Sequence, residues 1–496
     1  MKKNTLHIPL FTVEIWRKTL LFFLFSSFAS LSLAQTIAVS PELTLSSHQD
    51  YRFVGKLRDT AVLLLYEEDL FKLALYDDKM KFVLSEPFRP ERHNIDILET
   101  VIDKDFFSVV YRHAAQGKSS AKILRLNSQG KLLDSLTLQS MLRWGVSYEP
   151  TILVSEDRSK LLIYDLSDNN TTFNAVMFDL RTFKILWSRT FRPIGLDYNN
   201  ALKDAVIDNA GGVYWMLEHE NRKTKSANNR FDVVYFTAEL SQEWAMSIPL
   251  SGRIWQDAMF CFDNKNKKLV ATGLYSTKKT SQSEGAFFFA LAPLQPQPPD
   301  VQFNDFDAGF IQQLTGKEQR GNQGFQDFKL QKLIPRADGG VLMIGEYYKK
   351  YVRTMNTALG TRPNYGGAPY DTRTTIDYEY HDLLLASFYP NGTVQWKEML
   401  PKRQFSQDDD ALYSSFFLMK NKTGLRFIYN DDIKTGGNNI NEYIVIPDGT
   451  AQRHNLYNSE KLEMQLIPRE ARQTSATEVW IPSFRREKVQ LLRFNY

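Results

Sequence analysis

The chain has 496 residues, of which 61 are basic and 57 acidic, so its formal net charge is only +4. A nucleic-acid-binding protein is expected to gather a basic excess on one stripe, and none is visible, which argues against that class. The single cysteine, Cys261, excludes an internal disulfide, so the fold must be stabilised by burial, for which the chain is long enough.

Residues 1–34 have the pattern of a secretory signal peptide. Four basic residues precede an apolar run that ends near Leu33 and is too short to cross a bilayer as a retained helix. The small residues Ser32 and Ala34 predict cleavage after Ala34, which would leave 57 basic and 56 acidic residues. The next residue is Gln35 rather than cysteine, so we expect a periplasmic or secreted protein that is not a lipoprotein. No later apolar run is long enough for a transmembrane helix.

Residues 35–496 predict one all-β domain. Convincing helical periodicity is almost absent, apart from a short helix over Ala308–Leu314. The remainder is rich in short runs of β-branched and aromatic residues that end in Asn, Asp, Gly or Lys turns. The clearest runs are Ala61–Tyr66, Lys122–Leu126, Lys160–Tyr164, Val233–Phe236, Phe287–Ala290, Leu383–Phe388 and Glu442–Ile446.

These strands group into a repeated unit of four, which predicts a β-propeller. The third and fourth strands of a unit meet at tight turns such as Asn127–Gly130 and Pro390–Gly392, where glycine supplies the left-handed conformation that a hairpin needs. Eight blades are favoured. Seven is the alternative, because the boundary between two repeated units can be drawn in more than one way. The units begin near Tyr51, Arg92, Tyr148, Asn199, Gln256, Phe328, Leu412 and Lys461.

The last unit has only three strands, which predicts how the ring closes. The expected strands are Glu463–Pro468, Glu478–Phe484 and Lys488–Tyr496. A strand-like segment, Thr36–Ser46, precedes the first unit. We expect it to supply the missing fourth strand, because a closed ring leaves no open sheet edge.

Two stretches carry a family resemblance. Asp338–Glu346 followed by Asp382–Trp396 resembles the blades of exported bacterial propellers of the broad quinoprotein-like superfamily. The family's Asp-x-x-Thr-Gly-x-x-x-Trp turn is approximated at Asp179–Trp187, with Phe183 in place of the glycine. The leader is similar to those of Bacteroidota. The resemblance implies a fold and carries over no catalytic residue.

The insertions are unevenly distributed between the two faces of the predicted ring. Turns between first and second strands, and between third and fourth, are short. The connections expected on the opposite face are longer, and long loops are often functional. We therefore predict that this decorated face is the interaction surface. Its insertions are Ser167–Phe173, Asn221–Arg230, Ser276–Gly285, 307–327, 349–381 and Asp431–Asn441.

Aromatic and arginine side chains on this face are the candidate binding residues, since Trp, Tyr and Arg commonly anchor partners. The alternative is that they pack between adjacent blades. The loop after Lys349 is expected to be either an adaptable binding loop or disordered. The candidates are Arg143, Trp144, Tyr198, Arg253, Trp255, Asp257, Tyr365, Tyr370 and Arg403.

No motif in the chain predicts catalysis. Asp408–Asp410 and Asp431-Asp432 are dense carboxylates that would suit Ca²⁺ or acid–base chemistry, but solvated turns are the commoner outcome. Zinc-type His spacing, a nucleophile elbow and a phosphate loop are all missing. We therefore predict no catalytic residue, cofactor or metal, and a non-catalytic envelope protein that binds another protein or a glycan. The alternative is a polysaccharide-acting enzyme with carboxylates such as Asp257 or Asp409 at the channel mouth.

Overall fold

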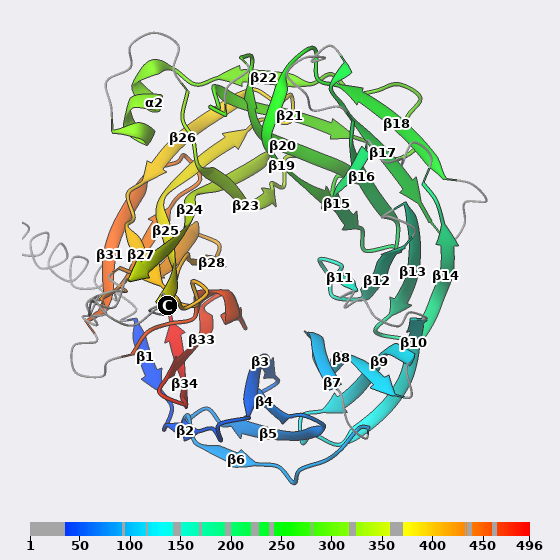
Figure 1. The fold of residues 1–496 in the computed structure, drawn as a ribbon, viewed down its shortest axis with the longest axis vertical. Coiled ribbons are helices and arrows are strands. Elements are labelled where there is room, and N and C mark those ends of the chain that lie inside the picture. Colours follow the sequence, from blue (N-terminus) through cyan, green and yellow to red (C-terminus); the bar gives the residue numbers. More distant parts are fainter. Residues whose placement is uncertain are drawn as a thin grey trace, which may run out of the picture.

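The computed structural model is a ring of eight antiparallel blades around a central opening (Figure 1). It describes residues 35–91, 95–115, 118–141, 150–167, 171–193, 200–219, 228–237, 243–278, 281–316, 324–357, 371–431, 433, 439–458 and 464–496. The prediction of an eight-bladed, all-β propeller is confirmed. No helix in these ranges is long and apolar enough to span a membrane.

Blades 1–4 each use four strands that are consecutive in the chain, with the first strand innermost and the fourth at the rim. Blade 1 contains β3 (Asp50–Leu57), β4 (Thr60–Glu67), β5 (Leu70–Tyr76) and β6 (Phe82–Leu84), and blade 2 contains β7 (Ile95–Ile102), β8 (Phe106–Ala115), β9 (Lys118–Asn127) and β10 (Leu132–Met141). Blade 3 contains β11 (Thr151–Val154), β12 (Lys160–Ser167), β13 (Thr172–Asp179) and β14 (Lys184–Phe191), and blade 4 contains β15 (Asn200–Ile207), β16 (Val213–His219), β17 (Arg230–Phe236) and β18 (Trp244–Pro249).

Blades 5–7 follow the same order, and a short helix, α2, joins blade 5 to blade 6. Blade 5 contains β19 (Ile254–Asp263), β20 (Lys268–Ser276), β21 (Gly285–Leu291) and β22 (Gln302–Asp305), followed by α2 (Ala308–Thr315). Blade 6 contains β23 (Phe328–Pro335), β24 (Val341–Thr357), β25 (Asp371–Phe388) and β26 (Val394–Leu400), with β27 (Gln404–Gln407) as an additional strand, and blade 7 contains β28 (Phe417–Lys420), β29 (Leu425–Asn430), β30 (Asn439–Val445) and β31 (Ala451–Asn458).

Blade 8 joins the two ends of the described chain, as the sequence predicted. Its C-terminal strands are β32 (Arg472–Gln473), β33 (Glu478–Arg485) and β34 (Lys488–Asn495), and β1 (Thr36–Val39) and β2 (Leu43–Thr44) both pair with β34. The predicted first strand, Glu463–Pro468, is wrong. Leu466 forms only one bridge, to Ser483, and a turn at Pro468–Glu470 moves the inner strand to β32.

The core is divided among the contacts between neighbouring blades. Eight clusters of buried side chains each join one blade to the next around the ring. The second strand of a blade, which lies inside its sheet, is therefore apolar on both faces: Ala61 to Leu65 in β4 are all at most 2% exposed. Consecutive apolar residues in the sequence are a direct consequence of this double burial.

Phe183 adopts the backbone conformation that the family pattern assigns to glycine. Its φ is 56°, in the left-handed region, and Asp179 holds the turn by accepting the N–H groups of Arg181 and Thr182. The Phe183 ring packs edge-on to Phe178 with centroids 5.1 Å apart. This packing offsets the cost of a left-handed non-glycine residue.

The insertion expected at 349–381 is built from strands in its described part. β24 and β25 continue far beyond the blade, pairing from Tyr348 with Tyr380 to Thr357 with Asp371, and β27 adds a third strand. Tyr378 and Tyr380 are buried in this extension. The described residues therefore form an ordered projection on the decorated face instead of a loop.

Candidate functional site

Several of the predicted binding residues lie outside the described residues. These are Arg143, Trp144, Tyr198, Tyr365 and Tyr370, whose roles stay predictions. Arg403 is described and exposed, in the link between β26 and β27.

Arg253 immediately precedes β19, and Trp255 and Asp257 lie near the start of that strand. The Arg253 guanidinium lies 4.0 Å from the centre of the Phe303 ring, and the Trp255 ring packs 5.8 Å from that of Phe231 in blade 4. Asp257 joins three blades, because it pairs with Lys203 of blade 4 at 3.3 Å and accepts the Leu330 N–H of blade 6 at 2.8 Å. The contacts of Trp255 and Asp257 match the alternative that the side chains pack between blades, whereas the Arg253 contact with Phe303 lies within blade 5.

The carboxylates of Asp408, Asp409 and Asp410 support the blade 6 projection. Asp408 accepts the Ile376 N–H at 2.7 Å and Asp410 accepts the Tyr378 hydroxyl at 3.1 Å. Asp409 accepts a backbone N–H within its own turn. No group of three or more potential metal ligands occurs in the part of the chain that the structure describes.

A β-bulge recurs between the first two strands of five blades. In blades 1, 2, 4, 5 and 6 the register between these strands slips by one residue, and bulges commonly redirect side chains. In three of these blades the next residue is an acid whose carboxylate accepts the following N–H. The residues that directly follow the bulge in the five blades are Gly55, Glu99, Asp204, Asp257 and Lys332.

Two adjoining hollows open along the inner strands, which surround the central opening in Figure 1. The first has a volume of about 380 Å³ and the second of about 610 Å³, and Arg158 and Arg472 line both. The second hollow includes residues of the short turns β3–β4, β7–β8 and β11–β12. The hollows therefore lie toward the face with short turns, opposite to the decorated face.

Four cations dominate the first hollow: Arg158, Lys332, Lys420 and Arg472 come from four different blades. Glu99 is the one carboxylate in its wall. Among the described residues none of the four cations forms an ion pair, and the Arg472 guanidinium donates only to the neighbouring Ala471 carbonyl. The hollow therefore carries a local excess of positive charge, although the chain as a whole is almost neutral.

Local hydrogen bonds fix the positions of these cations. The Gln473 side chain accepts the Lys420 N–H at 3.0 Å and donates to the Lys420 carbonyl at 2.6 Å, which holds β32 beside β28. Arg158 has a φ of 57° in a turn where Asp157 accepts the hydroxyls of Ser155 and Ser159, both at 2.8 Å. The cationic site is therefore preorganised by its backbone.

The pKa values reflect crowded positive charge. Burial lowers the pKa of Lys332, and the charge of Lys420 lowers it further. Burial also lowers the pKa of Arg472; Glu99 opposes this effect, whereas Arg158 adds to it. Lys332 is nevertheless open to solvent in the channel, so an entering anion reaches it without a rearrangement. An anion bound among these groups would relieve their mutual repulsion.

The sequence prediction missed this site because its residues are isolated in the chain. None belongs to a basic run, and Arg158 and Arg472 are separated by most of the sequence. The repeat pattern nevertheless contains a signal that could have identified these four residues. All four residues lie within, or just after, the first strand of a blade, which is the strand that faces the channel.

Cys261, in β19, is shielded rather than reactive. Burial, aided by the nearby Asp263, raises the pKa of its thiol to about 12, so the thiol stays protonated at neutral pH. We expect a thiolate-selective reagent to label the native protein at least ~100-fold more slowly than the unfolded chain. Stopped-flow absorbance measures both rates, and comparable rates would contradict the assignment.

No family model and no curated protein matches the sequence. Among solved structures, the chain is similar to an oligogalacturonate lyase in complex with manganese (8% identity over 92% of this chain and 97% of that one, TM-score 0.39). It is also similar to the propeller domain of the Trilobed protease from Pyrococcus furiosus (10% identity over 84% of this chain and 98% of that one, TM-score 0.37). A third similar structure is a dihydro-heme d1 dehydrogenase (10% identity over 92% of this chain and 78% of that one, TM-score 0.43). Likeness at this identity concerns the fold alone.

Proposed function

We propose that this propeller is a binding protein whose channel receives an anionic ligand, an acidic glycan of the cell envelope. The observation that carries the proposal is the set of four unpaired cations, Arg158, Lys332, Lys420 and Arg472, around one hollow. Clefts lined by one sign of charge concentrate ligands of the opposite sign, and guanidinium groups suit carboxylate and sulfate oxygens. Export through the predicted leader would bring the protein to such ligands.

The proposal differs from the expectation that the decorated face binds the partner. The charged hollows lie at the opposite end of the channel, so we assign the ligand to that end. The enzymatic alternative receives less support, because Asp257 is tied to Lys203 and the Leu330 N–H, and Asp409 to its own turn.

The test is calorimetric titration with a sulfated disaccharide, a uronic-acid disaccharide and a neutral disaccharide. We expect binding of a charged probe that weakens with added salt. The double substitution Arg158→Gln/Arg472→Gln should reduce the affinity by roughly 10–100-fold, since a hydrogen bond to a charged group contributes about 1.5–3 kcal/mol.

Lys184→Gln is the matched control, because Lys184 is an exposed cation on the rim strand β14 and should leave binding unchanged. Thermal melting checks that the variants fold. Absence of binding by both charged probes, or equal affinity in the double variant, would overturn the proposal.

A further inference from the structure

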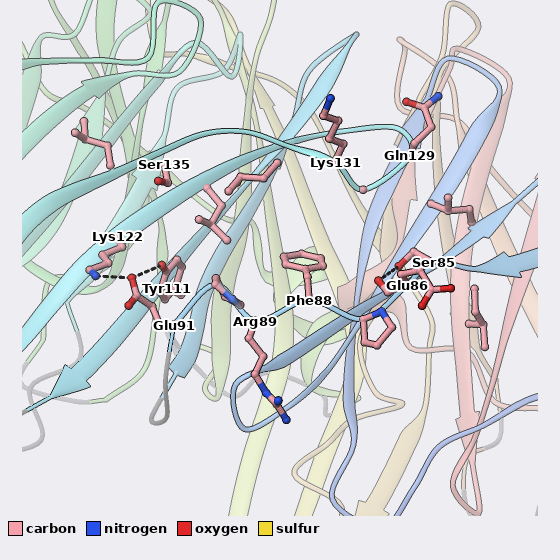
Figure 2. Close-up of a pocket in the computed structure, with 18 of the residues that line it drawn as sticks. Ser85, Glu86, Phe88, Arg89, Glu91, Tyr111, Lys122, Gln129, Lys131 and Ser135 are labelled. Carbon is pink, nitrogen blue, oxygen red and sulfur yellow. Dashed lines mark hydrogen bonds and ion pairs between the residues drawn. The ribbon is translucent and has the colours of Figure 1, made fainter.

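A groove of about 870 Å³ lies on the outer rim between blades 1 and 2, away from the charged channel (Figure 2). Figure 2 shows Phe88 at its centre, Glu91 with Lys122 and Tyr111 at one end, and Ser85 and Glu86 at the other. Its walls are mostly apolar, from Leu75, Val83, Leu84, Leu124, Leu132 and Leu136.

The groove exists because the rim strand of blade 1 is short. β6 has three residues and pairs only with Ala74–Tyr76 of β5. Beyond it, the chain touches β5 through Ser85, which bonds to Leu73, and through a bridge between Phe71 and Phe88. The blade 2 surface next to β6 is therefore left partly uncovered.

Several large aliphatic side chains are exposed on this uncovered surface. Val83 is 72% exposed and Leu132 48%, and Leu84 and Leu136 are exposed beside them. These four account for a third of the twelve large apolar side chains that are exposed among the described residues. A concentrated exposed apolar patch indicates an interaction site.

The same kind of gap occurs between blades 5 and 6, where helix α2 fills it. The rim strand β22 is also short, with four residues, and α2 follows it at the outer edge of the ring (Figure 1). Phe310, Ile311 and Leu314 of α2 are buried in the cluster that joins these two blades. This cluster also contains the partly buried Val394 and Met399 of β26.

The part of β26 on which α2 packs corresponds residue by residue to the part of β10 that lines the groove. Both strands follow the same hydrogen-bonded turn, closed by Gly392 N–H to Tyr389 in blade 6 and by Gly130 N–H to Asn127 in blade 2. In both blades the fourth strand then skips one residue in its pairing with the third strand. Val394, Lys397 and Met399 therefore correspond to Leu132, Ser135 and Thr137, all of which line the groove.

The charged residues at the groove can be compared with those at the α2 site. Asp307, the N-cap of α2, pairs with Lys397 at 2.7 Å. In the groove, Arg89 is paired with Asp69 and Lys122 with Glu91, whereas Lys131 at the start of β10 has no ion-pair partner in the described part of the chain. In the alignment of the two strands Lys131 corresponds to Thr393, so a helix N-terminus placed as Asp307 is placed would meet Ser135, which holds the Lys397 position.

We propose that the groove receives an amphipathic helix of a partner protein, with large apolar residues at positions i, i+1 and i+4. The proposal is independent of ligand binding in the channel.

The probe is a fluorescent, helix-stabilised peptide with the sequence of residues 305–316, titrated by anisotropy. Saturable binding is expected, and Val83→Glu should weaken it roughly tenfold, because a charge would enter the apolar wall. Ile185→Glu is the matched control, since Ile185 is a similarly exposed aliphatic residue on the rim strand of blade 3. Ser135→Lys should tighten binding by up to ~fivefold by restoring the Lys397 position, and an Asp307→Asn peptide should lose that gain.

Failure of the peptide to saturate, or equal binding by the Val83→Glu variant, would overturn the proposal. Sedimentation equilibrium tests a second copy as the occupant. A dimer that Val83→Glu dissociates would assign the groove to self-association and would overturn the partner-helix proposal.

Discussion

Replacing Lys402 with methionine is expected to lower the free energy of unfolding by about 3–5 kcal/mol, because it would leave the Glu346 carboxylate buried without its counter-charge. Both side chains are fully buried, with Lys402 Nζ 2.8 Å from Glu346 Oε1. That contact is an ion pair without hydrogen-bond alignment, and Lys402 donates instead to the Tyr380 carbonyl and Gln404 Oε1, at 3.0 and 2.7 Å.

The pair anchors the base of the blade 6 projection. Glu346 precedes the extended part of β24, Lys402 precedes β27, and Ser415 donates its hydroxyl to Glu346 Oε2 at 2.6 Å. Burial lowers the pKa of Lys402, and the Glu346 carboxylate opposes that effect. Loss of Lys402 would therefore leave the buried Glu346 carboxylate without its counter-charge.

Chemical denaturation measures the change, and two variants make the interpretation specific. Glu346→Gln/Lys402→Met should recover much of the loss, because no unpaired charge remains. Lys397→Met removes a lysine from a pair whose partner, Asp307, is 64% exposed, and should cost at most about 1 kcal/mol. A Lys402→Met variant as stable as Lys397→Met would contradict the prediction.

Removing residues 35–46 is expected to abolish cooperative folding of the ring. The deletion takes away β1 and β2, which both pair with β34, and leaves a long strand edge open to association. Ser40 adds to the closure: its N–H donates to the Leu491 carbonyl at 2.9 Å, and its hydroxyl accepts the Leu491 N–H at 3.0 Å.

Two substitutions give a graded version of this experiment. Leu45 is 5% exposed in the cluster between blades 8 and 1, so Leu45→Ala should cost about 2–5 kcal/mol. Thr36 is exposed, so Thr36→Ala should change stability by less than about 0.5 kcal/mol. Differential scanning calorimetry and light scattering report both stability and aggregation. A chain beginning at residue 47 that melts at the full-length temperature would show that closure is unimportant.

The blade count and the closure of the ring were predictable because both depend on local patterns. A strand buried on both faces, such as Ala61–Leu65, must be apolar at every position, and a tight turn such as Asn127–Gly130 needs a residue that tolerates the left-handed region. The helix Ala308–Thr315 was also predictable, because Asp307 caps its start and Gly316 its end. A missing fourth strand in the last unit then implied closure by the N-terminal segment.

Long-range pairing was not predictable from the same patterns. Lys349–Thr357 and Asp371–His381 are polar and flank a Gly- and Pro-containing stretch, which is typical of a loop. They are strands because each pairs with the other and β25 also pairs with β27. The prediction misplaced the inner strand of blade 8 for a related reason: the sequence near Leu466 is more apolar than β32, and pairing with β33 decides which segment is the strand.

The sequence by itself determined the eight-bladed ring and its closure, because both follow from residues that are neighbours in the chain. Only the tertiary structure decided which side chains share the channel and which part of the rim is uncovered. Arg158, Lys332, Lys420 and Arg472 meet because the ring brings the first strands of separate blades around one axis. Burial and charge act across space, so a site assembled from four blades leaves no contiguous pattern in the chain.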